Sequence, residues 1–282
     1  MIRTLQTATL GCSKNRVDTE HILAQVKDSY VIIPEGEDCA VDVFLLNTCG
    51  FIGDAKEESV QAILEAAVQA PTAGNMTLWS CIRVTDEKMK ADLAEHCDHQ
   101  PMIAKAPLVL VFYADYHRWV EAINAAMPDT ENRKAAEGDR MLAVMDAIIA
   151  CHAAVTAAES LGYGTCYIGD VIEDWEWHKE YFHLPPLVQP AAMAIIGAPT
   201  QQQKDRVKPA RFRVEDVCFE NTYQDGGAEK MLAMLKERQT PTLAPGMDFQ
   251  EWMERFVKRK WNCDFSEEMS RSAAVMLKEW KD

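Results

Sequence analysis

Three short segments of this 282-residue sequence combine residue types that could bind a ligand. The first is the turn Pro71-Thr72-Ala73-Gly74-Asn75, which follows a helix-like stretch. A backbone with small side chains can approach a flat ligand closely, and the Asn75 amide can donate and accept hydrogen bonds at the ligand's edge. The same residue types also end helices, so a simple helix stop is the alternative interpretation.

The second segment, Leu161 to Gly169, carries three glycines at the end of a long apolar stretch. A dinucleotide-binding glycine fingerprint follows a strand and opens a helix, whereas this segment closes a helix. The sequence therefore does not support dinucleotide binding by a doubly wound fold. A ligand-binding loop and a helix cap followed by a turn are both compatible with the pattern.

The third segment is a cluster of cations in a chain whose net charge is -15. A guanidinium group can donate two parallel hydrogen bonds to the oxygens of one phosphate. A positively charged segment in an acidic chain therefore predicts a phosphate site. A solvated surface loop is the alternative, because charge runs are usually just solvated. The cluster consists of Lys204, Arg206, Lys208, Arg211 and Arg213.

Composition limits the function classes. The strong negative charge argues against binding to nucleic acid, because a polyanion would be repelled. The N-terminus lacks the apolar core of a secretory signal, and no uninterrupted apolar run reaches the ~20 residues that span a bilayer. Nine cysteines, an odd number, suit free thiols in a reducing compartment. We expect a cytoplasmic protein that binds neither nucleic acid nor membrane.

The first fifty residues alternate between strand-like and helix-like patterns. Residues 5–10 are expected to form a short strand, and the apolar runs 30–33 and 43–46 predict buried strands. Residues 17–26 follow a polar turn and are expected to form a helix. Strand, helix, strand, strand is typical of a small α/β module with a partly parallel sheet.

The rest of the sequence also alternates between helix-like and strand-like patterns. Residues 57–70 have apolar positions three and four apart and end at Pro71, which predicts a helix. Residues 139–161 are apolar or small at nearly every position, so we expect a helix buried on all sides, inside the domain or in a dimer interface. The expected strands cover residues 78–84, 107–114 and 191–196, with an amphipathic stretch at 86–97.

In order and approximate spacing, the three ligand-binding segments resemble those of the FMN-dependent nitroreductases. The resemblance covers residues 57–282 and also takes in Leu78-Trp79-Ser80, Ala106-Pro107 and Leu184-Pro185-Pro186. It implies an α+β fold, with a mixed sheet flanked by helices and a long buried central helix. It also implies a homodimer that holds FMN at the subunit interface, is reduced by NADH or NADPH, and passes electrons to small nitro or quinone acceptors.

The resemblance assigns roles to particular residues. It places Pro71, Thr72, Ala73, Gly74 and Asn75 near the flavin ring, Ile168 and Gly169 against the ring's other side, and Lys208 and Arg211 at the phosphate. Since the flavin carries out the hydride chemistry, no catalytic side chain is expected. The family's N-terminal Arg-x-Ser-x-Arg segment, which grips the phosphate, does not precede Glu57. The alternative is a chimera that has lost FMN binding and is catalytically silent.

The N-terminal part resembles a different family, the radical-SAM methylthiotransferases. The matching segments are Leu10-Gly11-Cys12-Ser13-Lys14-Asn15 and Asn47-Thr48-Cys49-Gly50. This resemblance implies that Cys12 and Cys49 hold a [4Fe-4S] cluster, with Cys81 in the region of a third ligand. The catalytic Cys-x-x-x-Cys-x-x-Cys motif is absent from the sequence, so methylthiotransfer is not expected. An iron–sulfur protein is a further alternative, and a purely structural role for the cysteines is another.

Together these patterns predict two domains. Residues 1–56 form a methylthiotransferase-like α/β module, a Rossmann-like half, and residues 57–282 form a nitroreductase-like FMN domain with a C-terminal arm.

Overall fold

The computed structural model describes residues 3–9, 13–47 and 53–280. The chain divides into two compact units. The first unit contains Met1–Ala198 together with Ser272–Asp282, and the second contains Pro199–Arg271. The domain boundary predicted at residue 56 lies inside helix α2 (Gly53–Val68).

The first unit begins with a small parallel sheet in the order β2-β1-β3. Its elements are β1 (Arg3–Thr9), α1 (Ser13–Val26), β2 (Tyr30–Ile33) and β3 (Val43–Asn47). The Thr19 hydroxyl on α1 is 2.9 Å from the Thr9 hydroxyl and from the Asn47 amide nitrogen, so it ties the helix to β1 and β3. This arrangement confirms the predicted α/β module.

The larger sheet has four strands in the order β4-β5-β7-β6, all with antiparallel neighbours. The central strand β5 is buried along its whole length, because both faces of the sheet are covered. The sequence pattern of residues 161–169 favours a loop or a turn. The structure corrects this interpretation, because residues 164–168 form the edge strand β6, which pairs with β7. The strands are β4 (Trp79–Val84), β5 (Leu108–Asp115), β6 (Gly164–Ile168) and β7 (Val188–Gly197).

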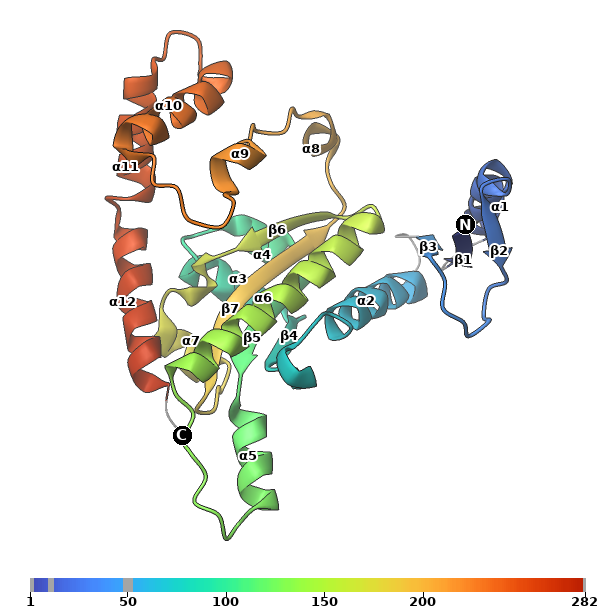
Figure 1. The fold of residues 1–282 in the computed structure, drawn as a ribbon, viewed down its shortest axis with the longest axis horizontal. Helices are drawn as coiled ribbons and strands as arrows, with labels where there is room; N and C mark the ends of the chain where they lie inside the picture. Colours follow the sequence, from blue (N-terminus) through green and yellow to red (C-terminus); the bar gives the residue numbers. More distant parts are fainter. Residues whose placement is uncertain (1–2, 10–12, 48–52, 281–282) are drawn as a thin grey trace. The chain divides into compact units, whose positions relative to one another are not determined.

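Alternate residues of β5 point to opposite faces of this sheet, as the period of two requires. Leu108, Leu110 and Phe112 join the core beneath α2 and α6 (Glu137–Ser160), and α6 runs along β5 and β7 with α2 beside it (Figure 1). The intervening β5 residues pack on the other face with α3 (Glu87–His96), α4 (Pro101–Lys105), α7 (Trp175–Tyr181) and the end of α12 (Asp264–Glu279). Helix α5 (His117–Ala126) and the short helices η1 (Ala73–Asn75) and η2 (Asp170–Ile172) complete this unit.

Within one chain, helix α6 is buried on one side only, so burial of its other side in a dimer interface stays a prediction. Alanines fill its buried side, where they allow close approach to the sheet and α2. The opposite side leaves five large apolar side chains 43–62% exposed. These are Met141, Leu142, Met145, Ile148 and Ile149, which we call the exposed α6 stripe.

By length and composition alone, α6 is the one helix among the described residues that could cross a membrane. The core helix of a globular protein can have the same length and the same apolar composition. The alanine-lined side packs against the sheet, so we assign α6 to the core.

The second unit is helical in its described elements. They are α8 (Gln201–Asp205), α9 (Val214–Val217), α10 (Gly227–Gln239), η3 (Thr240–Thr242), α11 (Phe249–Lys260) and the first half of α12. The second half of α12 belongs to the first unit, where Ser272, Met276 and the following Trp280 are buried.

The packing of α2 on the sheet leads to a stability prediction. Ile63 is 1% exposed in the core beneath α2, whereas Val68 on the same helix is 59% exposed. We expect Ile63→Ala to lower the free energy of unfolding by about 2–5 kcal/mol, since it removes buried methyl groups and leaves a cavity. Val68→Ala, the matched control, should change it by less than about 0.5 kcal/mol. Urea unfolding of the three proteins measures both values, and equal effects would contradict the packing described for α2.

Candidate functional site

The turn of small residues lies between α2 and β4 and has an unusual backbone. Gly74, Asn75 and Thr77 have φ angles of 57°, 57° and 52°. Asparagine tolerates the left-handed region, but the β-branched Thr77 is strained there and must be held by its surroundings.

One buried carboxylate closes this turn. The Thr72 hydroxyl donates to Asp146 Oδ2 at 2.6 Å, and the Leu78 backbone N–H donates to the same oxygen at 2.7 Å. The Thr77 N–H donates to the Thr72 hydroxyl at 2.8 Å. Asp146 lies on the buried side of α6 and is 4% exposed. The two ends of the turn are therefore fastened to one atom of the core helix.

Helix α5 supports the turn from another direction. The Trp119 indole N–H donates to the Met76 carbonyl at 2.7 Å, and Arg118 donates to the Trp79 carbonyl at 2.6 Å. Arg118 also pairs with the buried Asp115 carboxylate at 3.0 Å. These contacts fix the inner side of the turn.

The outer side of the turn is open. Ala73, Gly74 and Asn75 are exposed, and a Cβ atom added at Gly74 would meet only the Met76 side chain, at 3.6 Å. A rigid, open turn of this kind fits a flat aromatic ligand, which could lie against the backbone and receive hydrogen bonds from Asn75.

The second predicted contact region lies at the end of β6. The Ile168 side chain is 2% exposed and packs in the core, so only its backbone could contact a ligand. Gly169 is exposed, and a Cβ atom added there would meet nothing within 4 Å. Close backbone approach is therefore available at Gly169.

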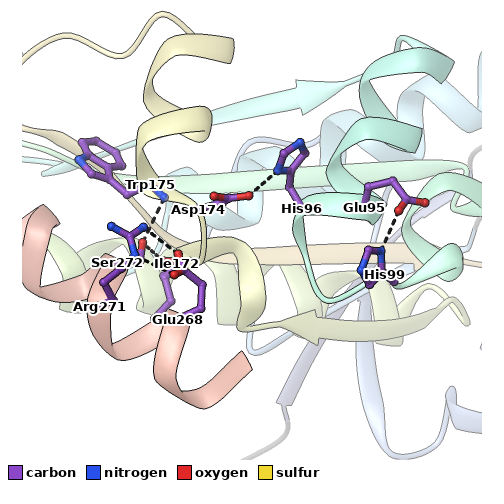
Figure 2. A network of polar contacts seen from close by, with 9 residues as sticks. All are labelled: Glu95, His96, His99, Ile172, Asp174, Trp175, Glu268, Arg271 and Ser272. Carbon is purple, nitrogen blue, oxygen red and sulfur yellow. Dashed lines mark hydrogen bonds and ion pairs between the residues drawn. The ribbon is translucent and has the colours of Figure 1, made fainter. Parts of the chain in front are cut away.

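A residue far away in the sequence holds the segment after Gly169. The Ser272 hydroxyl on α12 donates to the Ile172 carbonyl at 2.6 Å and accepts from the Trp175 N–H at 3.1 Å (Figure 2). On the α3 side, His96 Nδ1 lies 2.6 Å from Asp174 Oδ2. Nothing in the local sequence of residues 168–175 identifies Ser272 as a partner.

The two contact regions lie at opposite edges of the four-stranded sheet in one chain. The turn leads into β4, and Ile168 ends β6, with β5 and β7 between them. Neighbouring strands are about 4.8 Å apart, so three spacings separate the two edges by roughly 14 Å. The strand order alone therefore does not place Pro71–Asn75 next to Ile168–Gly169 in one chain.

The predicted phosphate ligands belong to the second unit. Lys208 and Arg211 lie in the segment between α8 and α9, and both are exposed. Neither has an ion-pair partner in the described part of the chain, whereas Arg213 pairs with Asp216 at 3.2 Å. Lys208 and Arg211 thus keep the free positive charge that a phosphate requires.

Of the predicted iron–sulfur ligands, Cys12 and Cys49 lie outside the described residues. Cys81 lies in β4, in the larger sheet, and packs against the core beneath α6. Burial raises the pKa of the Cys81 thiol to about 12, which disfavours the thiolate that binds iron. Within residues 3–9, 13–47 and 53–280, no group of three His, Cys, Asp or Glu side chains could hold a metal ion.

Comparison with protein families gives two overlapping matches. The model of the nitroreductase family matches residues 55–198. The model of the uncharacterized protein family UPF0004, the family of the methylthiotransferase N-terminal domain, matches residues 4–99. These matches confirm the predicted fusion, and both include residues 55–99.

Individual relatives resemble most of the chain. An NADPH-dependent oxidoreductase of Staphylococcus aureus is 26% identical over 227 residues, which cover 78% of this chain and 90% of that protein. The crystal structure of a proposed oxidoreductase from Bacteroides fragilis has a TM-score of 0.67 at 23% identity and covers 81% of this chain and 92% of its own. The NADPH:FMN oxidoreductase of Vibrio harveyi, complexed with NAD+, has a TM-score of 0.60 at 23% identity and covers 77% and 88%.

The aromatic core next to η2 predicts a pH dependence of stability. His178 is 1% exposed, its Nε2 lies 3.0 Å from the Tyr113 hydroxyl, and burial lowers its pKa from 6.5 to about 3. Between those values the unfolded chain binds a proton that the folded chain does not, so stability should fall as the pH falls from about 6.5 to about 3.

Removing the buried imidazole should remove part of that dependence. We expect His178→Gln to show a smaller loss of unfolding free energy between pH 6.5 and pH 4.5 than the wild type, whatever its stability at pH 6.5. His99→Asn, which changes an exposed histidine with a left-handed φ of 51°, should keep the wild-type dependence. Urea unfolding at the two pH values measures the difference, and an unchanged slope for His178→Gln would contradict the prediction.

Proposed function

Because this chain belongs to the nitroreductase family, we propose that it is an FMN-dependent enzyme that accepts hydride from NADH or NADPH and reduces small nitro or quinone acceptors. The family match and the NADPH-dependent relative make it an NAD(P)H oxidoreductase. The choice of FMN rests on the resemblance and on the fit of the residues to that cofactor.

The observation that carries the proposal is the open turn at residues 71–75. Its outer side is exposed, and its left-handed backbone is held by the hydrogen bond from Thr72 to Asp146. The exposed Asn75 amide can reach the edge of a ring. When bound, the flavin supplies the hydride and electron transfer. The chain's own task is to orient the ring on the backbone of Ala73 and Gly74, and to hold the phosphate with Lys208 and Arg211.

Two copies of the chain would complete the site. The turn and Gly169 lie at opposite sheet edges, so a ring that contacts both draws them from different subunits. The exposed α6 stripe supports the same proposal, because large apolar side chains in a row favour burial against a partner. We therefore propose a homodimer with the flavin between the subunits.

The rival function is a catalytically silent chimera, and one observation favours it. The position before α2 that should carry the Arg-x-Ser-x-Arg segment is occupied by the N-terminal module. Two charge-assisted contacts of about 1.5–3 kcal/mol each are then missing from the phosphate. The iron–sulfur alternative is less well supported, since the Cys81 thiol is buried in the larger sheet.

We propose a cytoplasmic location. Seven described cysteines are free, in keeping with a reducing compartment.

The absorption spectrum separates the proposal from its rival. Protein that is purified, mixed with FMN and desalted should keep a two-banded yellow spectrum that NADH or NADPH bleaches under anaerobic conditions. A protein that stays colourless after this treatment would support the silent chimera. A broad brown absorption lost in Cys12→Ala would instead support the iron–sulfur alternative.

The phosphate assignment has its own test. We expect Lys208→Ala combined with Arg211→Ala to weaken FMN binding at least tenfold, since about 1.4 kcal/mol corresponds to that factor. The matched control, Lys204→Ala combined with Arg206→Ala, removes the same charge from the same cluster and should weaken binding less. Fluorescence titration with FMN measures the dissociation constants, and equal losses in both double variants would show that only net charge matters.

A further inference from the structure

Asp146 is an unusual residue for its position. It lies among Ala143, Ala147 and Ala150 on the buried side of α6 and is 4% exposed. Burying a carboxylate is costly unless hydrogen bonds or a cation compensate for the lost water. Among the described residues, Asp146 has no ion-pair partner, so the hydrogen bonds from Thr72 and Leu78 must compensate for its lost hydration.

Asp139, the other buried acidic residue of α6, has different partners from Asp146. Asp139 pairs with Arg133 at 2.6 Å and accepts from the Ala136 N–H at 2.9 Å, at the start of the helix. Its role is explained by the helix terminus. Asp146 lies two turns further along, in the middle of the helix, where no terminus explains a charge.

The two donors to Asp146 come from the two ends of the turn. Thr72 precedes η1 and Leu78 follows it, so one oxygen atom draws both ends together. The residues between them include the left-handed Gly74, Asn75 and Thr77. Such backbone strain persists only where the surroundings over-determine it.

We infer that Asp146 is a positioning residue that holds the turn at residues 71–78 in the conformation that receives the flavin. It acts through Thr72 and Leu78 and does not itself touch the cofactor. This inference rests on the proposed function for its flavin part. The closure of the turn by Asp146 is a separate claim that can be measured without cofactor.

Hydrogen–deuterium exchange in the cofactor-free protein tests the closure. We expect the Thr77 and Leu78 amides to exchange at least tenfold faster in Asp146→Asn, because the amide replaces the charged acceptor shared by Thr72 and Leu78. Asp139→Asn, the matched control on the same helix, should leave the exchange of these two amides unchanged. Unchanged exchange in Asp146→Asn would overturn the inference.

Thr72 provides a second route if Asp146→Asn does not fold. Thr72→Val has nearly the same shape but no hydroxyl, and we expect it to speed exchange at Thr77 and Leu78. Thr72→Ser keeps the hydroxyl and should exchange like the wild type. Equal exchange in these two variants would overturn the role of the hydroxyl bridge to Asp146.

FMN titration tests the flavin part. We expect Asp146→Asn to bind FMN at least tenfold more weakly than the wild type, and Asp139→Asn to bind it as the wild type does. Wild-type affinity in Asp146→Asn would overturn the positioning role even if exchange is faster. If the wild type binds no FMN, the proposed function fails, and the exchange result still decides whether Asp146 closes the turn.

Discussion

The first unit depends on how closely α6 approaches the larger sheet. Ala143, Ala147, Ala150, Ala154 and Ala158 line its buried side and are fully buried. Because none of them extends beyond Cβ, the helix lies close to β5 and β7 and leaves room for Ile63 and Ala67 of α2. The same closeness lets the short Asp146 side chain reach the backbone at Leu78. A larger residue in this row would separate the helix from both the sheet and the turn.

Much of this fold could be predicted from the sequence. Runs such as Leu108–Asp115 are apolar and β-branched enough to indicate buried strands, and Pro71 and Gly162 mark helix ends. Two features could not be predicted. Helix α6 is apolar on every side, so its pattern does not tell which side faces the sheet, and β6 starts in a glycine-rich segment with weak strand propensity.

The candidate site was predictable only in its exposed part. The small residues of the turn stand together in the sequence, whereas Asp146 and Ser272 reach their partners across 68 and 97 or more residues. Periodicity carries no information about such distant pairs. It also could not show that the Ile168 side chain points into the core, which leaves Gly169 as the open position.

The second half of α12 returns to the first unit after the chain has formed the second. Ser272, Met276 and Trp280 are buried there, next to the segment that follows Gly169. During synthesis, the sheet from β4 to β7 leaves the ribosome with this part of its surface still uncovered. The nascent chain must therefore keep an incomplete core in water until residues 272–280 have emerged, and only then can the segment after Gly169 take its final conformation.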